Sequence, residues 1–224
     1  MADTRGTLLP VYVLADESHS MGRHMGELNR GLSDLHEALL GEPMAAAKVR
    51  FSILGFSDDV KQRMRLADLR REDRLPTLAT RGRTNYTRAF ADLRRRLPHD
   101  VRALKAEGYV VHRPAVFMLT DGQPSDDGWQ LEHAKLVDPR ITFEAPNIIA
   151  CGIGNARPAT ILRVATRREF AFVALAGVDV GEAIVQFCSA LTRSIIASVP
   201  ARDAGPPRLV VQPPAGFSMA IDVV

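Results

Sequence analysis

The chain has 224 residues, which is enough for one large domain or at most two small ones with a closed apolar core. Apolar residues make up 46% and charged residues 25%, a globular composition that excludes extended disorder and collagen-like repeats. The net charge is only +3, but segment 61–113 has 15 basic and 6 acidic residues, whereas the rest of the chain has 14 basic and 20 acidic residues.

Apolar runs rich in β-forming residues recur along the chain and predict strands. The first, 8–15, is continuously apolar, as expected for a strand that is covered on both faces. We expect a second strand at 49–56 and a third at 60–66, joined as a hairpin through residues 57–59. Three more runs predict strands at 114–119, 147–153 and 170–175.

Helical patterns lie between these strands. The clearest is 25–39, where apolar residues recur at spacings of three and four and form one stripe that stops before Gly41 and Pro43. Further helices are predicted at 87–97, at 101–107 beyond Pro98, and at 130–136, 158–165 and 180–199.

The alternation of strands and helices predicts an α/β fold. We expect a doubly wound, Rossmann-like architecture with a mostly parallel central sheet, one antiparallel edge strand and helices on both faces. Ligands of such folds bind beyond the carboxyl ends of the strands. We assign residues 1–200 to this domain, and residues 201–224 to a Pro- and Gly-rich tail that can strap onto it.

Three features predict a cytoplasmic protein without membrane contact. Residues 1–10 have no long apolar segment of the kind found in signal peptides, and no stretch approaches the ~20 apolar residues of a membrane helix. The two cysteines, Cys151 and Cys188, form no CxxC pair, which argues against a zinc finger or a thioredoxin-type motif. Both lie in apolar patterns, so we expect reduced core thiols.

Three oxygen-bearing side chains follow the first predicted strand. Asp16, Ser18 and Ser20 alternate along the chain, so they face one side of an extended turn. Two hydroxyls and a carboxylate are hard ligands that suit Mg²⁺ or Mn²⁺ better than zinc. Taken alone, the same residues are equally typical of a turn that caps a helix.

Two further segments favour a metal site over a capping turn. Thr84 lies in a Gly-Arg-Thr-Asn loop before a predicted helix, and Asp121 follows the predicted strand 114–119. Because such loops can converge at one edge of a doubly wound sheet, we expect both side chains to join the three residues above in one constellation.

In this order, and after buried strands, these motifs resemble the von Willebrand factor A domain. The five side chains match its metal-ion-dependent adhesion site (MIDAS). The surrounding sequence is similar to the TerY-like branch of that family, which is associated with tellurium resistance; the similar stretches are LPVYVLADESHSM, VFMLTDGQPSDDGW, NIIACGIG and the final amphipathic helix. The resemblance covers about Leu8 to Val199.

The resemblance implies a non-enzymatic interaction module. A divalent cation, Mg²⁺ (or Mn²⁺ or Ca²⁺), would bind an Asp or Glu of a partner protein, because neutral hydroxyl ligands leave its charge available to a further ligand. The TerY-like branch further implies a bacterial stress response linked to Ser/Thr kinases and PP2C-type phosphatases. The cysteine-rich extension of some TerY-like relatives is not implied, since this chain lacks those cysteines.

We assign His19, Arg83, Asn85 and Gln123 to a partner-binding rim around the metal. Two of them depart from the family pattern, which commonly has a small residue where this chain has His19, and often a second glycine where it has Arg83. His19 would crowd the metal loop, add a titratable group to the rim, or point into solvent. Arg83 would favour an acidic partner or be solvated.

Two other functions compete with this interpretation. A Mg²⁺-dependent phosphohydrolase would need a second Asp where this chain has Ser18, and there is no GxxxxGK[ST] phosphate loop. Nucleic-acid binding through the basic segment 61–113 is electrostatically sound, but only Tyr86, Phe90 and Tyr109 supply aromatic rings there. Since the segment contains Thr84, we interpret its basic bias as part of the rim around a cation site.

Overall fold

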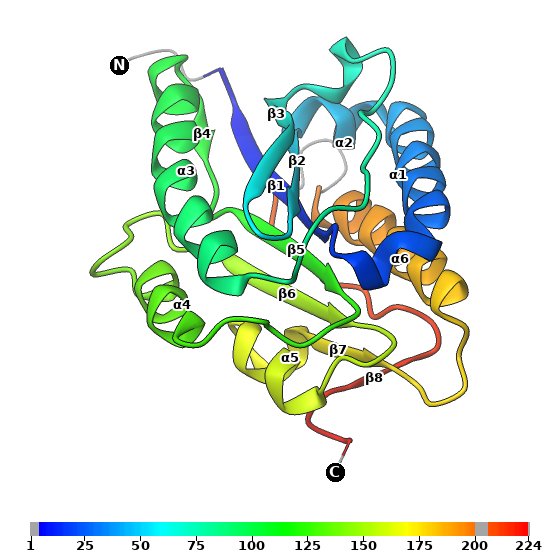
Figure 1. The fold of residues 1–224 in the computed structure, drawn as a ribbon. Coiled ribbons are helices and arrows are strands. Elements are labelled where there is room, and N and C mark those ends of the chain that lie inside the picture. The colour runs from blue at the N-terminus through cyan, green and yellow to red at the C-terminus, as the bar shows by residue number, and fades with distance from the viewer. Residues whose placement is uncertain (1–4, 200–205, 224) are drawn as a thin grey trace.

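The computed structural model describes residues 5–199 and 206–223, and within them eight strands form one sheet. The strands follow one another in space as β3-β2-β1-β5-β6-β7-β8, and β4 pairs with the start of β1 (Figure 1). Their bounds are β1 (Thr7–Asp16), β2 (Val49–Phe56), β3 (Val60–Ala67), β4 (Val110–Val111), β5 (Ala115–Thr120), β6 (Asn147–Gly152), β7 (Ala171–Ala174) and β8 (Phe217–Met219).

All neighbouring strands are parallel except at the two edges, where β3 pairs with β2 and β8 with β7 in antiparallel fashion. The predicted hairpin of β2 and β3 is therefore confirmed. The expectation of a single antiparallel edge strand is wrong, because β8 is a second one. Its three residues come from the predicted tail, where prolines and glycines hide any strand pattern.

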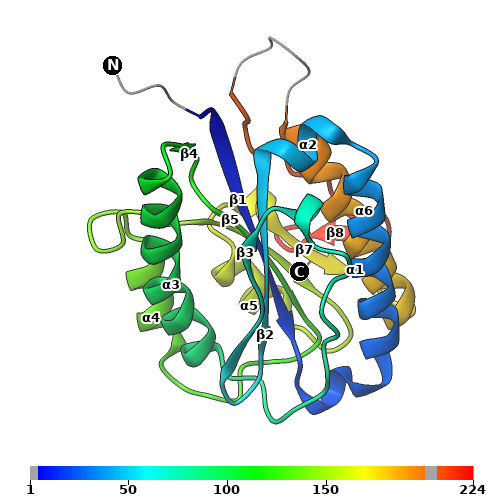
Figure 2. The ribbon, with the colours of Figure 1, turned by 90° about the horizontal axis from the view of Figure 1, so that it is seen from above.

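Helices cover both faces of the sheet, as predicted (Figure 2). One face carries α1 (Met25–Leu40), α2 (Pro43–Lys48) and α6 (Val180–Ser198), and the other carries α3 (Tyr86–Ala106), α4 (Trp129–Val137) and α5 (Pro158–Val164). Short 3₁₀ helices are η1 (His19–His24), η2 (Leu69–Arg71) and η3 (Arg168–Phe170). The helical region predicted at 87–97, with its extension at 101–107, is one continuous helix, α3, and Pro98 lies inside it.

The core has two layers, one on each side of β1. Val11, Val13 and Ala15 pack toward α1 and α6, whereas Tyr12 and Leu14 pack toward α3, α4 and α5. This is the period-2 alternation of a strand that is buried on both faces. The chain goes from β1 to β2 on one side and later returns to β5 on the other, so the strand order reverses between β1 and β5. This switch point is where doubly wound folds bind ligands.

The described part of the predicted tail, residues 206–223, packs on the same domain. The hydroxyls of Ser194 and Ser198 on α6 accept hydrogen bonds from the amides of Gln212 (2.9 Å) and Val210 (2.8 Å). The predicted boundary at residue 200 falls within 200–205, outside the described residues.

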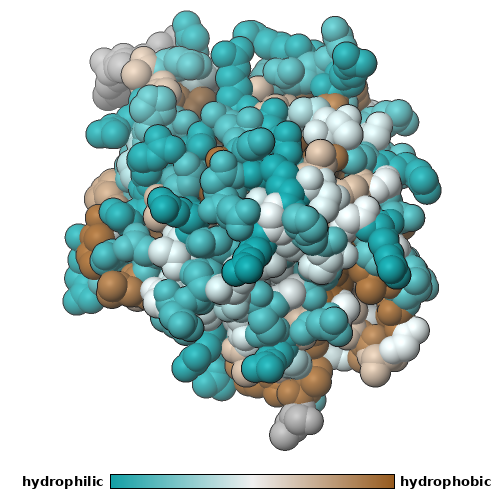
Figure 3. All heavy atoms as spheres, viewed as in Figure 1, coloured by the Kyte–Doolittle hydropathy of each residue, from teal (hydrophilic) through white to brown (hydrophobic). Residues whose placement is uncertain are grey.

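Helix α6 is more apolar than expected. By length and composition alone it could cross a membrane, whereas we predicted no stretch that approaches a membrane helix. Half of its apolar stretch is buried inside the molecule, and its inner face packs against α1 and the sheet. The face of the molecule in Figure 3 is mainly hydrophilic, and hydrophobic side chains lie toward its margins.

Candidate metal centre

The five predicted ligands come from three segments at the carboxyl edge of the sheet. Asp16 ends β1, Ser18 and Ser20 follow it, Asp121 follows β5, and Thr84 precedes α3. Three of the side chains are linked by short polar contacts. Ser18 Oγ lies 3.1 Å from Ser20 Oγ, which donates a hydrogen bond of 2.7 Å to Asp121 Oδ1.

Asp16 is fully buried at this edge. Its Oδ1 accepts a hydrogen bond from the Ser18 amide (2.8 Å) and its Oδ2 accepts one from Thr120 Oγ1 (2.6 Å). Burial raises the pKa of this carboxyl to about 6, and the neighbouring Asp121 acts in the same direction, while the hydrogen bonds from Ser18 and Thr120 oppose the shift. Burial also raises the pKa of Asp121. No basic side chain of the described residues lies within ion-pair distance of Asp16.

Thr84, in the loop before α3, lies close to the loop that carries Asp121. A Cβ atom added to Gly122 would lie 3.5 Å from Thr84 Oγ1, so this hydroxyl sits next to the loop that carries Asp121. The Thr84 carbonyl accepts hydrogen bonds from the Ser125 amide (2.8 Å) and hydroxyl (3.0 Å), which tie the two loops together.

The centre opens into a hollow of about 560 Å³. Three predicted ligands, Ser18, Ser20 and Thr84, are among the residues that line it. Its complete lining is Ser18, His19, Ser20, Asp58, Gly82, Arg83, Thr84 and Ser125. A ligand from a partner would therefore reach the hydroxyl ligands from solvent.

The donor chemistry fits a divalent cation with a preference for oxygen. The centre offers three neutral hydroxyls and two carboxylates, one of them buried without a cationic partner. Across residues 5–199 and 206–223 there is no group of three or more His, Cys, Asp or Glu side chains arranged to hold a metal. The low number of charged ligands is what distinguishes this centre from a carboxylate-rich calcium site or a His- and Cys-based zinc site.

Two of the four predicted rim residues line the hollow. His19 is exposed, and its amide (3.1 Å) and Nδ1 (2.9 Å) both contact the Gly82 carbonyl. Because a carbonyl oxygen only accepts, Nδ1 carries the proton and Nε2 remains open for another partner. Arg83 is exposed beside it, and its amide donates to Asp58 Oδ1 (3.0 Å).

The other two rim residues are engaged away from the hollow. Asn85 caps α3, where its Oδ1 accepts a hydrogen bond from the Arg88 amide (2.8 Å). Gln123 accepts one from Thr160 Oγ1 (2.8 Å) and donates one to the Asn155 carbonyl (3.4 Å). Both side chains thus have local structural roles.

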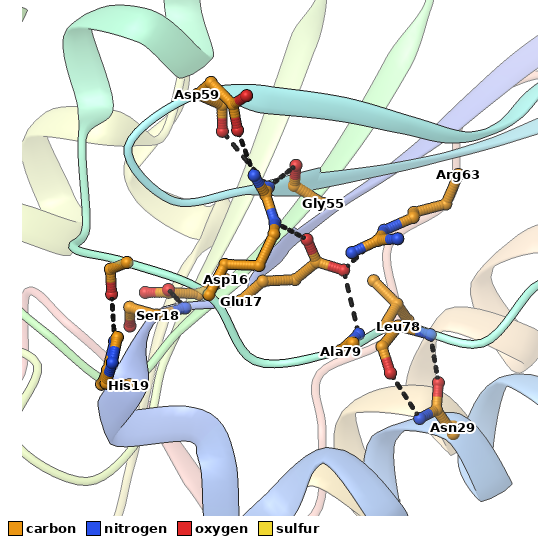
Figure 4. A network of polar contacts seen from close by, with 12 residues as sticks. Asp16, Glu17, Ser18, His19, Asn29, Gly55, Asp59, Arg63, Leu78 and Ala79 are labelled. Carbon is orange, nitrogen blue, oxygen red and sulfur yellow. Dashed lines mark hydrogen bonds and ion pairs between the residues drawn. The ribbon is translucent and has the colours of Figure 1, made fainter.

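Sequence reasoning missed two acids that build the loops. Asp126 lies shortly before α4 in the sequence, yet its carboxylate accepts from the amides of Tyr86 (2.8 Å) and Thr87 (3.0 Å) and so caps α3. Glu17 was not singled out, yet its buried carboxylate binds two arginines (Figure 4). Neither contact has a local sequence signal, since the partners lie about 40 or more residues away.

Comparisons with known proteins place the fold. No family model matches this sequence, and no curated protein matches it. Solved structures do match. The proximal thread matrix protein PTMP1 from the mussel byssus, in a form with a zinc-occupied MIDAS motif, aligns with a TM-score of 0.60 and 17% identity over 86% of this chain and 48% of its own.

Two bacterial structures match in the same way. The pilus adhesin SpaC from Lactobacillus rhamnosus GG aligns with a TM-score of 0.67 and 12% identity, over 86% of this chain and 30% of SpaC. The von Willebrand factor type A protein from Catenulispora acidiphila aligns with a TM-score of 0.53 and 13% identity, over 85% of this chain and 43% of its own. The chain has the von Willebrand factor A fold. It spans less than half the length of these neighbours.

Proposed function

We propose that this chain is a non-enzymatic protein-interaction module that holds a divalent cation at its candidate metal centre and binds an acidic side chain of a partner protein there. The observation that carries the proposal is the environment of Asp16. This carboxylate is fully buried, and its neighbours are hydroxyl groups, an amide and a second carboxylate. An ionised group in such a place is costly unless a positive charge joins it.

Each residue type has a distinct part in this function. Asp16 and Asp121 supply negative charge, while Ser18, Ser20 and Thr84 supply neutral oxygen atoms at the wall of the hollow. A cation bound mainly by neutral ligands keeps enough charge to attract a carboxylate from outside. We propose Mg²⁺ as the ion, with Mn²⁺ or Ca²⁺ as substitutes; the zinc in the PTMP1 structure supports the divalent charge.

The partner is proposed to present an Asp or Glu, with Arg83 and His19 next to the point of contact. The description of SpaC as a pilus adhesin supports an interaction role. The resemblance to the TerY-like branch supports a bacterial stress-response setting with a Ser/Thr kinase or PP2C-type phosphatase. The two free, buried cysteines support a cytoplasmic location.

The basic segment 61–113 is less available to nucleic acid than its composition suggests. Six of its basic side chains are paired with acidic side chains of the same chain; these are Arg63, Arg70, Arg81, Arg94, Arg95 and Arg96. This internal use of charge favours the protein-interaction role.

The first test is metal binding by the isolated protein. Calorimetric titration with MnCl₂ is expected to give one saturable site in the wild type, and none in Asp16→Ala or Thr84→Ala. Asp138→Ala is the matched control, since Asp138 pairs with Arg140 in the turn after α4. Absence of saturable binding to the wild type would contradict the proposal.

The second test is partner capture from the native host. Immobilised protein is incubated with host lysate in Mg²⁺ or in EDTA, and the retained proteins are identified by mass spectrometry. The proposal predicts a protein that is retained by the wild type and by Asp138→Ala in Mg²⁺ only, and by neither site variant. Retention that is unchanged in EDTA and in Asp16→Ala would refute the metal bridge.

A further inference from the structure

Glu17 lies between two predicted metal ligands in the sequence, but its side chain belongs to a different network. The carboxylate is fully buried and points away from Ser18 and His19 (Figure 4). Oε1 accepts hydrogen bonds from Arg63 Nε (2.8 Å) and the Ala79 amide (3.3 Å), and Oε2 accepts one from Arg81 Nε (2.7 Å). Both carboxylate oxygens are therefore occupied.

The backbone of β2 is shaped for this carboxylate. A Cβ atom added to Gly55 would lie 2.2 Å from Glu17 Cδ, so only glycine leaves room for the group. The Gly55 carbonyl also accepts a hydrogen bond from Arg81 Nη2 (2.8 Å), and Arg81 Nη1 pairs with Asp59 in the turn between β2 and β3. Two arginine side chains thus pair with two carboxylates next to Gly55, where β2 has no side chain.

The same network fastens the loop that carries Thr84. The Arg81 amide donates to the Glu17 carbonyl (2.6 Å), and the His19 amide donates to the Gly82 carbonyl (3.1 Å). Together with the contacts of Ala79 and Arg81 to the carboxylate, these bonds hold residues 79–82 against the end of β1. Thr84 follows two residues later, at the wall of the hollow.

We propose that Glu17 is a positioning residue of the metal centre. Through Arg81 and the Ala79 amide it holds the 79–84 loop so that Thr84 lies at the same hollow as Ser18 and Ser20, before any cation or partner binds. This inference rests on the proposed function, because it concerns the affinity of that same site. Residues that orient the ligands of a metal typically change its affinity about 10- to 100-fold when they are replaced.

Neutralising charges of opposite sign within the network separates positioning from simple electrostatics. Glu17→Gln removes a negative charge near the centre, so both explanations predict weaker cation binding. Arg81→Gln removes a positive charge, so a through-space effect predicts tighter binding. The positioning role predicts weaker binding instead, because the loop loses its anchor.

Asp68 supplies matched control variants. It is also a buried acid with two arginine neighbours, Arg70 (2.6 Å) and Arg50 (3.8 Å). It follows β3, whose last residue pairs with Phe51 and, through it, with Val11 of β1. From the rise of a strand, this is roughly 16 Å along β1 from Asp16. Asp68→Asn and Arg70→Gln thus disturb a similar ion pair without touching the 79–84 loop.

The experiment is MnCl₂ titration calorimetry on the full chain, with hydrogen exchange of residues 79–85 measured in EDTA. We expect Glu17→Gln and Arg81→Gln to bind Mn²⁺ about 10- to 100-fold more weakly than the wild type and to exchange these amides faster. Asp68→Asn and Arg70→Gln are expected to bind like the wild type. If Glu17→Gln does not fold, Arg81→Gln decides by the sign of its effect.

The outcomes distinguish the two proposals. A wild type without saturable Mn²⁺ binding overturns the proposed function. A wild type that binds, together with an Arg81→Gln variant that binds equally well or more tightly, overturns the positioning role and leaves the proposed function standing. A loss of affinity in the Asp68 controls as large as in Arg81→Gln also overturns it, because the effect would then follow from general destabilisation.

Discussion

Asp16 and Glu17 are adjacent acids at the end of β1, both fully buried, and their surroundings are opposite. Glu17 meets two guanidinium groups, whereas Asp16 meets hydroxyls, an amide and the nearby Asp121. The alternation of a strand sends the two side chains to opposite faces. Burial alone therefore does not mark a functional acid; what matters is whether the protein itself supplies the opposite charge.

The largest change in stability is expected when Glu17 is replaced. Glu17→Ala leaves Arg63 and Arg81 without their shared partner, and breaking a buried pair from one side typically costs about 3–5 kcal/mol of unfolding free energy. Urea denaturation in EDTA measures this change. A cost below that of the exposed-pair variant Asp138→Ala would show that Glu17 is not a structural ion-pair partner.

Replacing Asp16 with the neutral residue Asn is expected to stabilise the metal-free protein. The pKa of Asp16 is raised by burial from 3.8 to about 6, so the folded state holds a proton that the unfolded state releases between these values. The contribution of Asp16 to stability is thus full below pH 3.8 and is lost as the pH rises through 6. One unit of pKa shift corresponds to ~1.4 kcal/mol. The free energy of unfolding of Asp16→Asn, relative to that of the wild type, should therefore rise by about 3 kcal/mol between pH 4 and pH 7.

Denaturant titrations of both proteins in EDTA across this pH range test the prediction. Subtracting the two curves cancels the other carboxylates that titrate there. Saturating Mg²⁺ should reverse the order at pH 7, since only the wild type binds the ion. A constant difference across the range would show that Asp16 is not a strained, unpaired charge.

A smaller effect is expected at the rim. Arg83 lines the hollow without belonging to either acid, so Arg83→Ala should weaken binding of the acidic partner by ~3-fold, as is typical of an exposed charge. Mn²⁺ affinity should not fall, because a positive charge is removed. Surface plasmon resonance with the captured partner, at two salt concentrations, measures the first quantity. A fall in Mn²⁺ affinity would place Arg83 in the support of the loop instead.

The same comparison explains which parts of the site could be predicted from sequence. Asp16, Ser18 and Ser20 were recognisable because they follow an apolar strand at a regular spacing, and Asp121 follows a second such strand. Their convergence follows from the topology of a doubly wound sheet. The partners of Glu17 lie 46 to 64 residues away in a loop and an edge strand, where no periodicity connects them.

The fold was predictable for similar reasons. Parallel strands buried on both faces leave continuous apolar runs, and amphipathic helices leave stripes, so the central layers were evident. The edge strand β8 was not, because three residues in a Pro- and Gly-rich segment carry no alternation. The capping of α3 by Asp126 was not evident from the sequence either, since capping is a local rule and the partners of Asp126 lie 39 and 40 residues away.

The central claim is that a divalent cation compensates the charge of Asp16 and is held by three hydroxyl ligands. Anomalous diffraction from a crystal of the protein grown with MnCl₂ tests it most directly. The account predicts one anomalous peak at the wall of the hollow, within bonding distance of oxygen atoms of Ser18, Ser20 and Thr84, that disappears in crystals of Asp16→Ala. A wild-type crystal at saturating Mn²⁺ with no peak at this position would contradict it.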